Sequence, residues 1–163
     1  MGDLIKFKRM VGHLAEQLKL EGLEPDEEGS CYLAFDEDLM MKCSILHDSN
    51  QIEMVSYVGM LSKDSPAVLM EMLKCNHFWS DTAGANLGLS TDDNTVMLSH
   101  RIDMDFVDED RFYKIVENFV NAMDHWKVKF PELYTVSEHD VSQGVTTQGS
   151  LTTTGDSAFM MGV

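Results

Sequence analysis

Apolar residues near the start of the chain recur every three or four positions, which is the spacing of one face of an α-helix. The stripe consists of Leu4, Phe7, Val11, Leu14 and Leu18. Asp3 can cap the first turn, and Pro25 follows the last position that a helix could occupy. We therefore predict a helix over residues 3–20. Ile5 and Met10 lie beside the stripe and widen its apolar face.

The apolar spacing changes to alternation after residue 30. Cys31–Phe35 is a short apolar run, and Leu39–Leu46 and Ile52–Met60 alternate apolar with more polar positions. Polar turns at residues 36–38 and 47–50 separate the three runs. Alternating runs joined by short turns predict an antiparallel meander of three strands.

Helical spacing returns at Ser65–Asn76, where a capping Ser precedes a Pro at the first helical position. Residues 85–89 and 95–102 are strand-like and predict a second hairpin. A last helix starts at the acidic residues 108–110, and we expect Pro131 to follow its end. The predicted order is αβββαββα, an α+β fold in which helices flank a twisted antiparallel sheet.

The composition changes from about Val136, where Ser, Thr and Gly become frequent and no apolar period is sustained. Such a segment buries too little apolar surface to offset the entropy of ordering. We therefore expect one folded domain over residues 1–135 and a flexible tail over residues 136–163.

The chain is strongly acidic, with 28 acidic against 12 basic residues and a formal net charge of −16. This charge repels nucleic acid and anionic membrane surfaces, and it suits a basic partner or simply keeps the protein soluble. No apolar run is long enough to span a membrane, and the first residues lack the apolar core of a secretory signal. We expect a soluble protein of the cytoplasm, without membrane insertion or nucleic-acid binding.

Residues that could carry catalysis or bind a metal do not fall into recognisable patterns. The six His lack metal-ligand spacing, the acidic clusters do not fit a calcium loop, and no nucleophile motif is present. Three cysteines without a CxxC pair are typical of reduced cytoplasmic thiols. We expect no catalytic residue, metal or cofactor. The 13 Met residues suit either core packing or an adaptable binding surface.

Three segments resemble the class I type III secretion chaperones, the Tir-chaperone family. They are residues 65–76, the hairpin formed by residues 85–89 and 95–101, and residues 112–126. The element order, the size and the acidity of the chain agree with that family. The resemblance implies a bacterial homodimer that binds the N-terminal region of a secreted effector. The effector would be held extended and competent for export without ATP.

The resemblance and the surplus of apolar positions together indicate two surfaces. The expected effector-binding residues, on the first helix and the meander, are Ile5, Phe7, Met10, Leu14, Met41 and Met54. The expected dimer interface, on the second helix and the last hairpin, consists of Val68, Met72, Leu87 and Met97. A regulator or adaptor of the same fold, unconnected with secretion, is the alternative function. A metal- or ligand-dependent enzyme is a third, more distant one.

Overall fold

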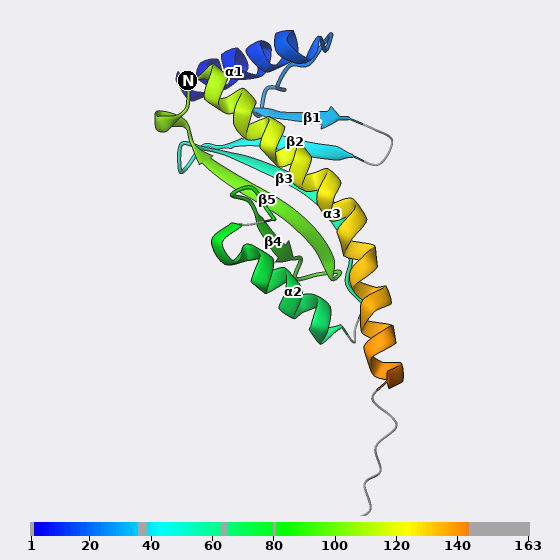
Figure 1. The fold of residues 1–163 in the computed structure, drawn as a ribbon. Helices are drawn as coiled ribbons and strands as arrows, with labels where there is room; N and C mark the ends of the chain where they lie inside the picture. The colour runs from blue at the N-terminus through cyan, green and yellow to red at the C-terminus, as the bar shows by residue number, and fades with distance from the viewer. Residues whose placement is uncertain (1, 36–38, 63–64, 80, 144–163) are drawn as a thin grey trace, which may run out of the picture.

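The computed structural model describes residues 2–35, 39–62, 65–79 and 81–143. The expected turn at residues 36–38 and most of the expected tail, residues 144–163, lie outside this described part. The helices and strands follow the predicted order (Figure 1). They are α1 (Gly2–Leu18), β1 (Ser30–Ala34), β2 (Met40–Leu46), β3 (Gln51–Met60), α2 (Pro66–Asn76), β4 (Asn86–Leu89), β5 (Thr95–Asp103) and α3 (Glu109–Gln143), with the short 3-10 turns η1 (His77–Trp79) and η2 (Met104–Phe106).

The five strands form one antiparallel sheet in the order β1-β2-β3-β5-β4. The meander pairs each strand with the next, and β5 then lies beside β3, so that β4 ends at the edge opposite β1. The α+β prediction is therefore confirmed. The sheet has two edges, β1 and β4, and their outward backbone groups have different hydrogen-bond partners.

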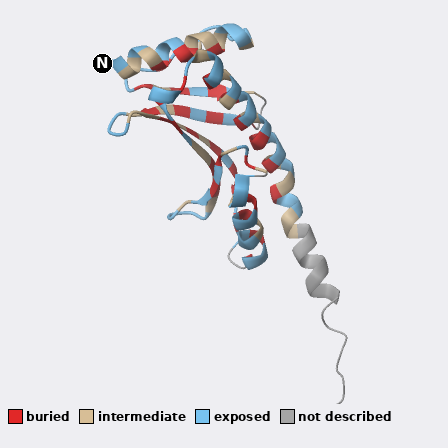
Figure 2. Ribbon diagram, turned by 60° about the vertical axis from the view of Figure 1, so that its left-hand side comes forward, coloured by how far each residue is buried: buried red, intermediate tan, exposed pale blue. Residues whose placement is uncertain are grey.

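One face of the sheet is covered by α1 and α3, which also pack against each other. Inward-facing strand residues such as Met41, Met54 and Leu98 are fully buried beneath them. Phe7 of α1 meets Phe112 of α3 edge to face, with ring centroids 6.3 Å apart. Figure 2 shows buried positions along the strands in the middle of the sheet and along α3. The core is thus a layer between the sheet and two helices from opposite ends of the sequence.

The last helix is longer than predicted, because α3 continues through Pro131 to Gln143. Proline removes one hydrogen bond of a helix without necessarily ending it, provided that contacts on both sides hold the backbone. Those contacts exist here. Phe130 is buried, and the Tyr134 hydroxyl accepts a hydrogen bond from Ser62 N at 3.1 Å and donates to Met60 O at 3.3 Å. The expectation that Pro131 follows the helix end was wrong.

The two later helices begin differently. Asp108 caps α3 as its acidic start predicts, since its Oδ1 accepts the backbone N–H of Arg111 at 2.8 Å. Ser65 precedes Pro66 as expected, but its hydroxyl bonds to that of Ser62 at 2.6 Å and makes no capping bond.

Candidate binding surfaces

The outer edge of β1 carries backbone groups that no other strand uses. Ser30 directs both of its backbone groups outward, because its N–H donates to Asp26 Oδ1 at 2.8 Å and its carbonyl accepts from Asp26 N at 2.8 Å. Antiparallel strands alternate this direction at every residue. The N–H and C=O groups of Tyr32 and Ala34 therefore also point away from β2. Both residues are exposed, and within the described part of the chain nothing pairs with this side of them.

An apolar groove begins where β1 ends. Its volume is about 180 Å³, and it lies between the C-terminal half of α1, the first half of α3 and Phe35, the residue after β1. The lining residues are Leu14, Leu18, Phe35, Tyr113, Val116, Glu117, Val120 and Asn121. An unpaired strand edge beside an apolar groove is the combination that receives an extended peptide.

Most of the residues predicted to contact an effector are instead in the core. Phe7, Met10, Leu14, Met41 and Met54 are at most 1% exposed. The reason is that α1 is covered twice, by the sheet and by α3, so its broad apolar face leaves no surplus there. In this structure four of these side chains are enclosed within the chain itself, and Leu14 reaches the wall of the groove. Ile5 is 70% exposed and remains a candidate contact.

Four groove residues that are only partly buried were not among the expected effector-binding residues, and one of them, Leu18, belongs to the predicted apolar stripe of the first helix. Phe35, Tyr113 and Val120 pack against the core and still line the groove. A signal existed for one of them, since Phe35 is an aromatic residue between a strand and an acidic turn. The contributions of α3 required knowledge of which face of that helix meets α1.

The opposite edge of the sheet is closed by a side chain. Asn76, the last residue of α2, donates from Nδ2 to Leu87 O at 3.0 Å and accepts from Leu87 N at 2.8 Å. The amide therefore satisfies both outward backbone groups of Leu87 in β4, as a neighbouring strand would. An edge blocked in this way is not free to pair with another strand at that position. Within the described residues, β1 therefore has the longer stretch of unpaired edge, at Tyr32 and Ala34.

Most of the residues predicted to form the dimer interface are also buried within the chain. Val68, Met72 and Leu87 are buried within the chain, and Met97 is half-buried on the uncovered face of the sheet. The exposed side of α2 consists instead of Leu69, Met70 and Leu73, the last of which is 64% exposed. Val68 and Met72 form the stripe that packs inward, and Leu69 and Leu73 belong to the stripe that faces outward. Both stripes have helical spacing, so the sequence does not distinguish them.

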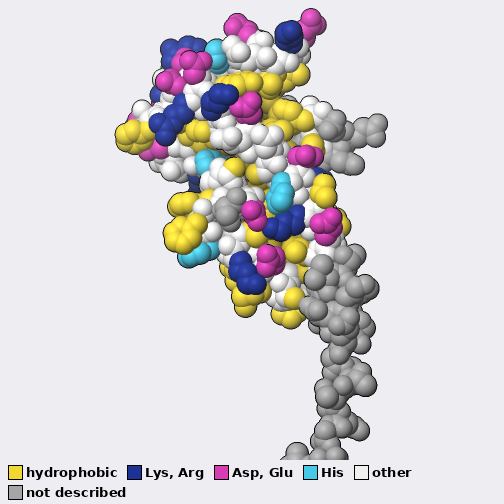
Figure 3. All heavy atoms as spheres, in the orientation of Figure 1, with side chains coloured by type: hydrophobic (Ala, Val, Ile, Leu, Met, Phe, Trp, Pro, Cys, Tyr) yellow, Lys and Arg dark blue, Asp and Glu magenta, His cyan; other side chains and the backbone are white. Residues whose placement is uncertain are grey.

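Two aromatic residues extend this exposed face of α2. Phe78 and Trp79 lie in the turn η1, are largely exposed and have positive φ values of 59° and 53°. Residues other than Gly rarely adopt such backbone angles, so the turn holds the two rings in place at a cost in strain. Figure 3 shows apolar side chains on the surface over α2 and the turn that follows it. We call Leu69, Met70, Leu73, Phe78 and Trp79 the α2 patch.

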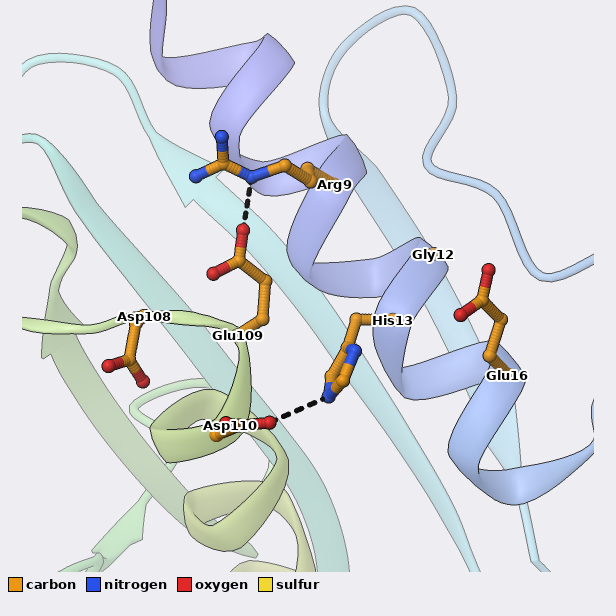
Figure 4. Close-up of a pocket in the computed structure, with 7 residues that line it drawn as sticks. All are labelled: Arg9, Gly12, His13, Glu16, Asp108, Glu109 and Asp110. Atoms are coloured by element: carbon orange, nitrogen blue, oxygen red, sulfur yellow. Dashed lines mark ion pairs between the residues drawn. The ribbon is translucent and has the colours of Figure 1, made fainter.

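A wide polar hollow lies between α1 and the start of α3 (Figure 4). It measures about 640 Å³ and is open to solvent. Arg9 pairs with Glu109, and His13 Nε2 lies 3.1 Å from Asp110 Oδ1. Such exposed pairs contribute about 0–1 kcal/mol each. Their geometry serves to join α1 to α3 and offers no nucleophile with an adjacent base.

A second polar cluster joins the loop before β4 to α3. Lys129 Nζ lies 2.7 Å from Asp81 Oδ2, and Trp126 donates from Nε1 to Asp81 O at 2.9 Å. The hydrogen bond from Lys129 lowers the pKa of Asp81. The thiol of Cys75 lies 3.4 Å from both charged partners, and burial raises its pKa. The described residues contain no group of three or more His, Cys, Asp or Glu that could hold a metal ion.

None of the described helices combines the length and the apolar character needed to cross a membrane.

Comparisons with known proteins agree with this architecture. A chain of the ExsC–ExsE complex covers 76% of this chain and 92% of its own length, with a TM-score of 0.63 at 20% identity. A chain of the HopA1–SchA chaperone–effector complex covers 78% and 97%, with a TM-score of 0.63 at 16% identity. A protein of Chlamydia pneumoniae is 31% identical over 106 residues, which are 64% of this chain and 79% of that protein.

The family model of the Tir chaperone proteins (CesT) matches residues 9–127. This range begins inside α1, includes the whole sheet with both of its edges and α2, and ends in α3 just after Trp126. The match therefore spans most of the chain and every element that forms the surfaces described above. The chain belongs to the Tir chaperone protein (CesT) family.

Proposed function

We propose that this protein is a type III secretion chaperone that binds the N-terminal region of a secreted effector in the bacterial cytoplasm. It keeps that region extended and competent for export. The observation that carries the proposal is the open outer edge of β1 beside the apolar groove at Phe35. Family membership supports it, and so does the likeness of the fold to a chain of a chaperone–effector complex.

The edge of β1 supplies affinity that depends little on the sequence of the client. An extended segment that pairs with Tyr32 and Ala34 gains backbone hydrogen bonds whatever its side chains are. Its side chains alternate between the two sides of the added strand. One set is directed toward the groove at Phe35 and the other toward solvent, so apolar residues at alternate positions are the main requirement.

The net charge of −16 favours a client segment rich in Lys and Arg, because opposite charges accelerate encounter and fix orientation. Binding of this kind consumes no nucleotide and requires no reacting side chain. We therefore propose a holding role, without ATP and without enzymatic activity.

The test uses N-terminal fragments of the proteins that the native secretion system exports, co-expressed with the chain. Affinity is measured by calorimetry for each fragment that co-purifies. Ala34→Pro removes an outward N–H from β1, and proline at an edge obstructs strand addition. We expect binding to weaken about tenfold or more, the equivalent of one or two lost hydrogen bonds.

Ala34→Ser is the matched control, since it keeps the N–H at the same exposed position and should bind within about twofold of the wild type. Equal binding by the Pro and Ser variants would refute the β1 site. Failure of every exported fragment to bind would refute the chaperone function. A partner that binds at β1 but is not exported would favour the regulator or adaptor alternative.

We further propose that two copies associate through the α2 patch. The patch is a group of large apolar side chains that neither the sheet nor the other helices cover. Homodimers bury such faces against a second copy of themselves. The resemblance to class I chaperones points to the same assembly.

A further inference from the structure

Two of the three cysteines lie directly opposite each other on neighbouring strands. Cys31 of β1 is the register partner of Cys43 of β2. Both side chains point to the inner face of the sheet, where they are 4% and 1% exposed. Both are free thiols in this structure. The role proposed for the chain uses neither of them.

The type of strand pair sets the distance between them. Gly29 O accepts from Ile45 N at 2.9 Å, and Leu39 O accepts from Phe35 N at 2.9 Å. Hydrogen-bonded pairs alternate with non-bonded ones, so Cys31 and Cys43 also form a hydrogen-bonded pair. The Cα atoms of such a pair are about 5.5 Å apart, within the range of about 4.4–6.8 Å that disulfides span.

The two thiols differ in how readily each loses its proton. The hydrogen bond from Cys43 lowers the pKa of Cys31, although burial and nearby Asp26 oppose this effect. The same hydrogen bond, followed by burial, raises the pKa of Cys43 well above its ordinary value. Cys31 therefore forms a thiolate more readily than Cys43 does.

We propose that Cys31 and Cys43 form a reversible intrachain disulfide when the protein meets hydrogen peroxide. The Cys31 thiolate attacks one peroxide oxygen, the O–O bond breaks, and the departing hydroxide takes a proton to become water. Cys31 is now a sulfenic acid. The sulfur of Cys43 attacks it, the S–O bond breaks, and the Cys43 proton leaves with the hydroxide as a second water. Two thiols are oxidised by two electrons, and one peroxide is reduced to two waters.

Geometry makes this bond a transient modification. The Cβ atoms of a hydrogen-bonded pair lie about 1 Å farther apart than those of a relaxed disulfide. Closing the bond must pull β1 toward β2, and a strained disulfide is readily reduced by cytoplasmic thiols. The modification stands on the β1–β2 register and is independent of what binds at the edge of β1.

The test treats the full chain carrying Cys75→Ala with hydrogen peroxide and follows free thiols and peptide masses. We expect both remaining thiols to disappear together. The peptides that contain Cys31 and Cys43 should be joined and two hydrogens lighter than their sum. The chain should keep its size on a column, and dithiothreitol should restore both thiols.

Cys43→Ala in the same background is the matched variant, in which Cys31 has no partner and should proceed to sulfinic acid or remain reduced. Cys75, equally buried in the wild type, should join neither of the other two cysteines. Because peptide mapping of the Cys75→Ala protein needs no further substitution, poor folding of the Cys43 variant does not obscure the result. A Cys31 sulfinic acid with Cys43 still free, or a disulfide between two chains, would overturn the proposal.

Discussion

Gly59 lies where β3 is in close contact with α3. The strand carries an irregularity between Tyr57 and Gly59, and a Cβ placed on Gly59 would lie 2.4 Å from Cε1 of Phe130. That ring is buried and cannot swing aside. We expect Gly59→Ala to lower the free energy of unfolding by about 1–3 kcal/mol, the usual effect of overpacking, measured by urea denaturation.

Gly88 is the control for this prediction, because a Cβ there would meet nothing within 4 Å. Gly88→Ala should change the free energy of unfolding by less than about 0.5 kcal/mol. If the two alanine variants had equal urea midpoints, the close approach of α3 to β3 would not be a determinant of stability.

His100 gives the protein a sensitivity to mild acid. Desolvation lowers the pKa of this side chain below its ordinary value of 6.5, although the backbone of Gly84 opposes the effect. As the pH decreases through 6.5, the unfolded chain binds the proton before the folded one does, so stability falls below that pH. His100→Gln should flatten this part of the stability profile.

The matched variant for the pH experiment is His47→Gln, at an exposed position in the turn after β2. Its stability should fall with pH as steeply as that of the wild type. Thermal denaturation at a series of pH values measures how steeply the stability of each variant falls with pH. Parallel profiles for the His100 variant and the wild type would contradict the role of His100.

At the same scale, the sequence predicted which apolar residues share one face of a helix. It did not predict which of these faces are buried and which are exposed. The spacing of Phe7 and Leu14 placed them on one face of α1, and that face is buried. The spacing contained no information about α3, which packs on α1 in addition to the sheet. On α2, Val68 and Leu69 belong to adjacent stripes with the same period, and only the position of the sheet distinguishes the inner stripe from the outer one.

At the scale of elements, α3 is the least predictable feature. Proline in a helix interior costs about 3 kcal/mol relative to alanine in a host peptide, which is why Pro131 predicted a helix end. The bonds of Tyr134 to Ser62 and Met60 hold the following turn in helical form nevertheless. Contacts that are distant in sequence offset the local preference, and the helical spacing alone does not contain them.

Pro131→Ala should therefore stabilise the protein. The substitution restores an N–H at an established helical position, and we expect a gain of about 1–3 kcal/mol in urea denaturation. Amide exchange in the turns after residue 131 should slow. Val128→Ala, at an exposed position of the same helix, controls for the choice of alanine and should gain at most a few tenths of a kcal/mol. A loss of stability in the Pro131 variant would mean that the proline fits a bend that the contacts require.

At the scale of the whole molecule, the element order and the sheet could be predicted from the sequence, because each strand run and each turn has a local signal. Which backbone groups at the two edges of the sheet are paired could not be predicted from the sequence. Whether Asn76 meets β4, and whether anything meets β1, depends on how the connections place elements beside each other.

The α2 patch predicts a dimer, with a mass of twice 18.4 kDa by light scattering at micromolar concentration. Leu73→Asp puts a charge in the middle of the patch and should give the monomer, because burying an unpaired charge is prohibitive. Val128→Asp makes the same change at an exposed apolar position of α3 and should leave the dimer intact. A wild-type protein of 18.4 kDa would refute the dimer.

The packing of α1 on α3 has a consequence for how the protein is made. The hydrogen bond from Lys6 to Met104 O joins residues 98 positions apart, and Phe7 and Phe112 are farther apart still. The ribosome releases the N-terminal helix long before it has synthesised the segment that covers it. Until then Phe7, Met10 and Leu14 are not fully buried, and contacts between residues so far apart in the sequence form slowly. The nascent chaperone is therefore itself a chain with exposed apolar residues, and it completes its core only after α3 has been synthesised.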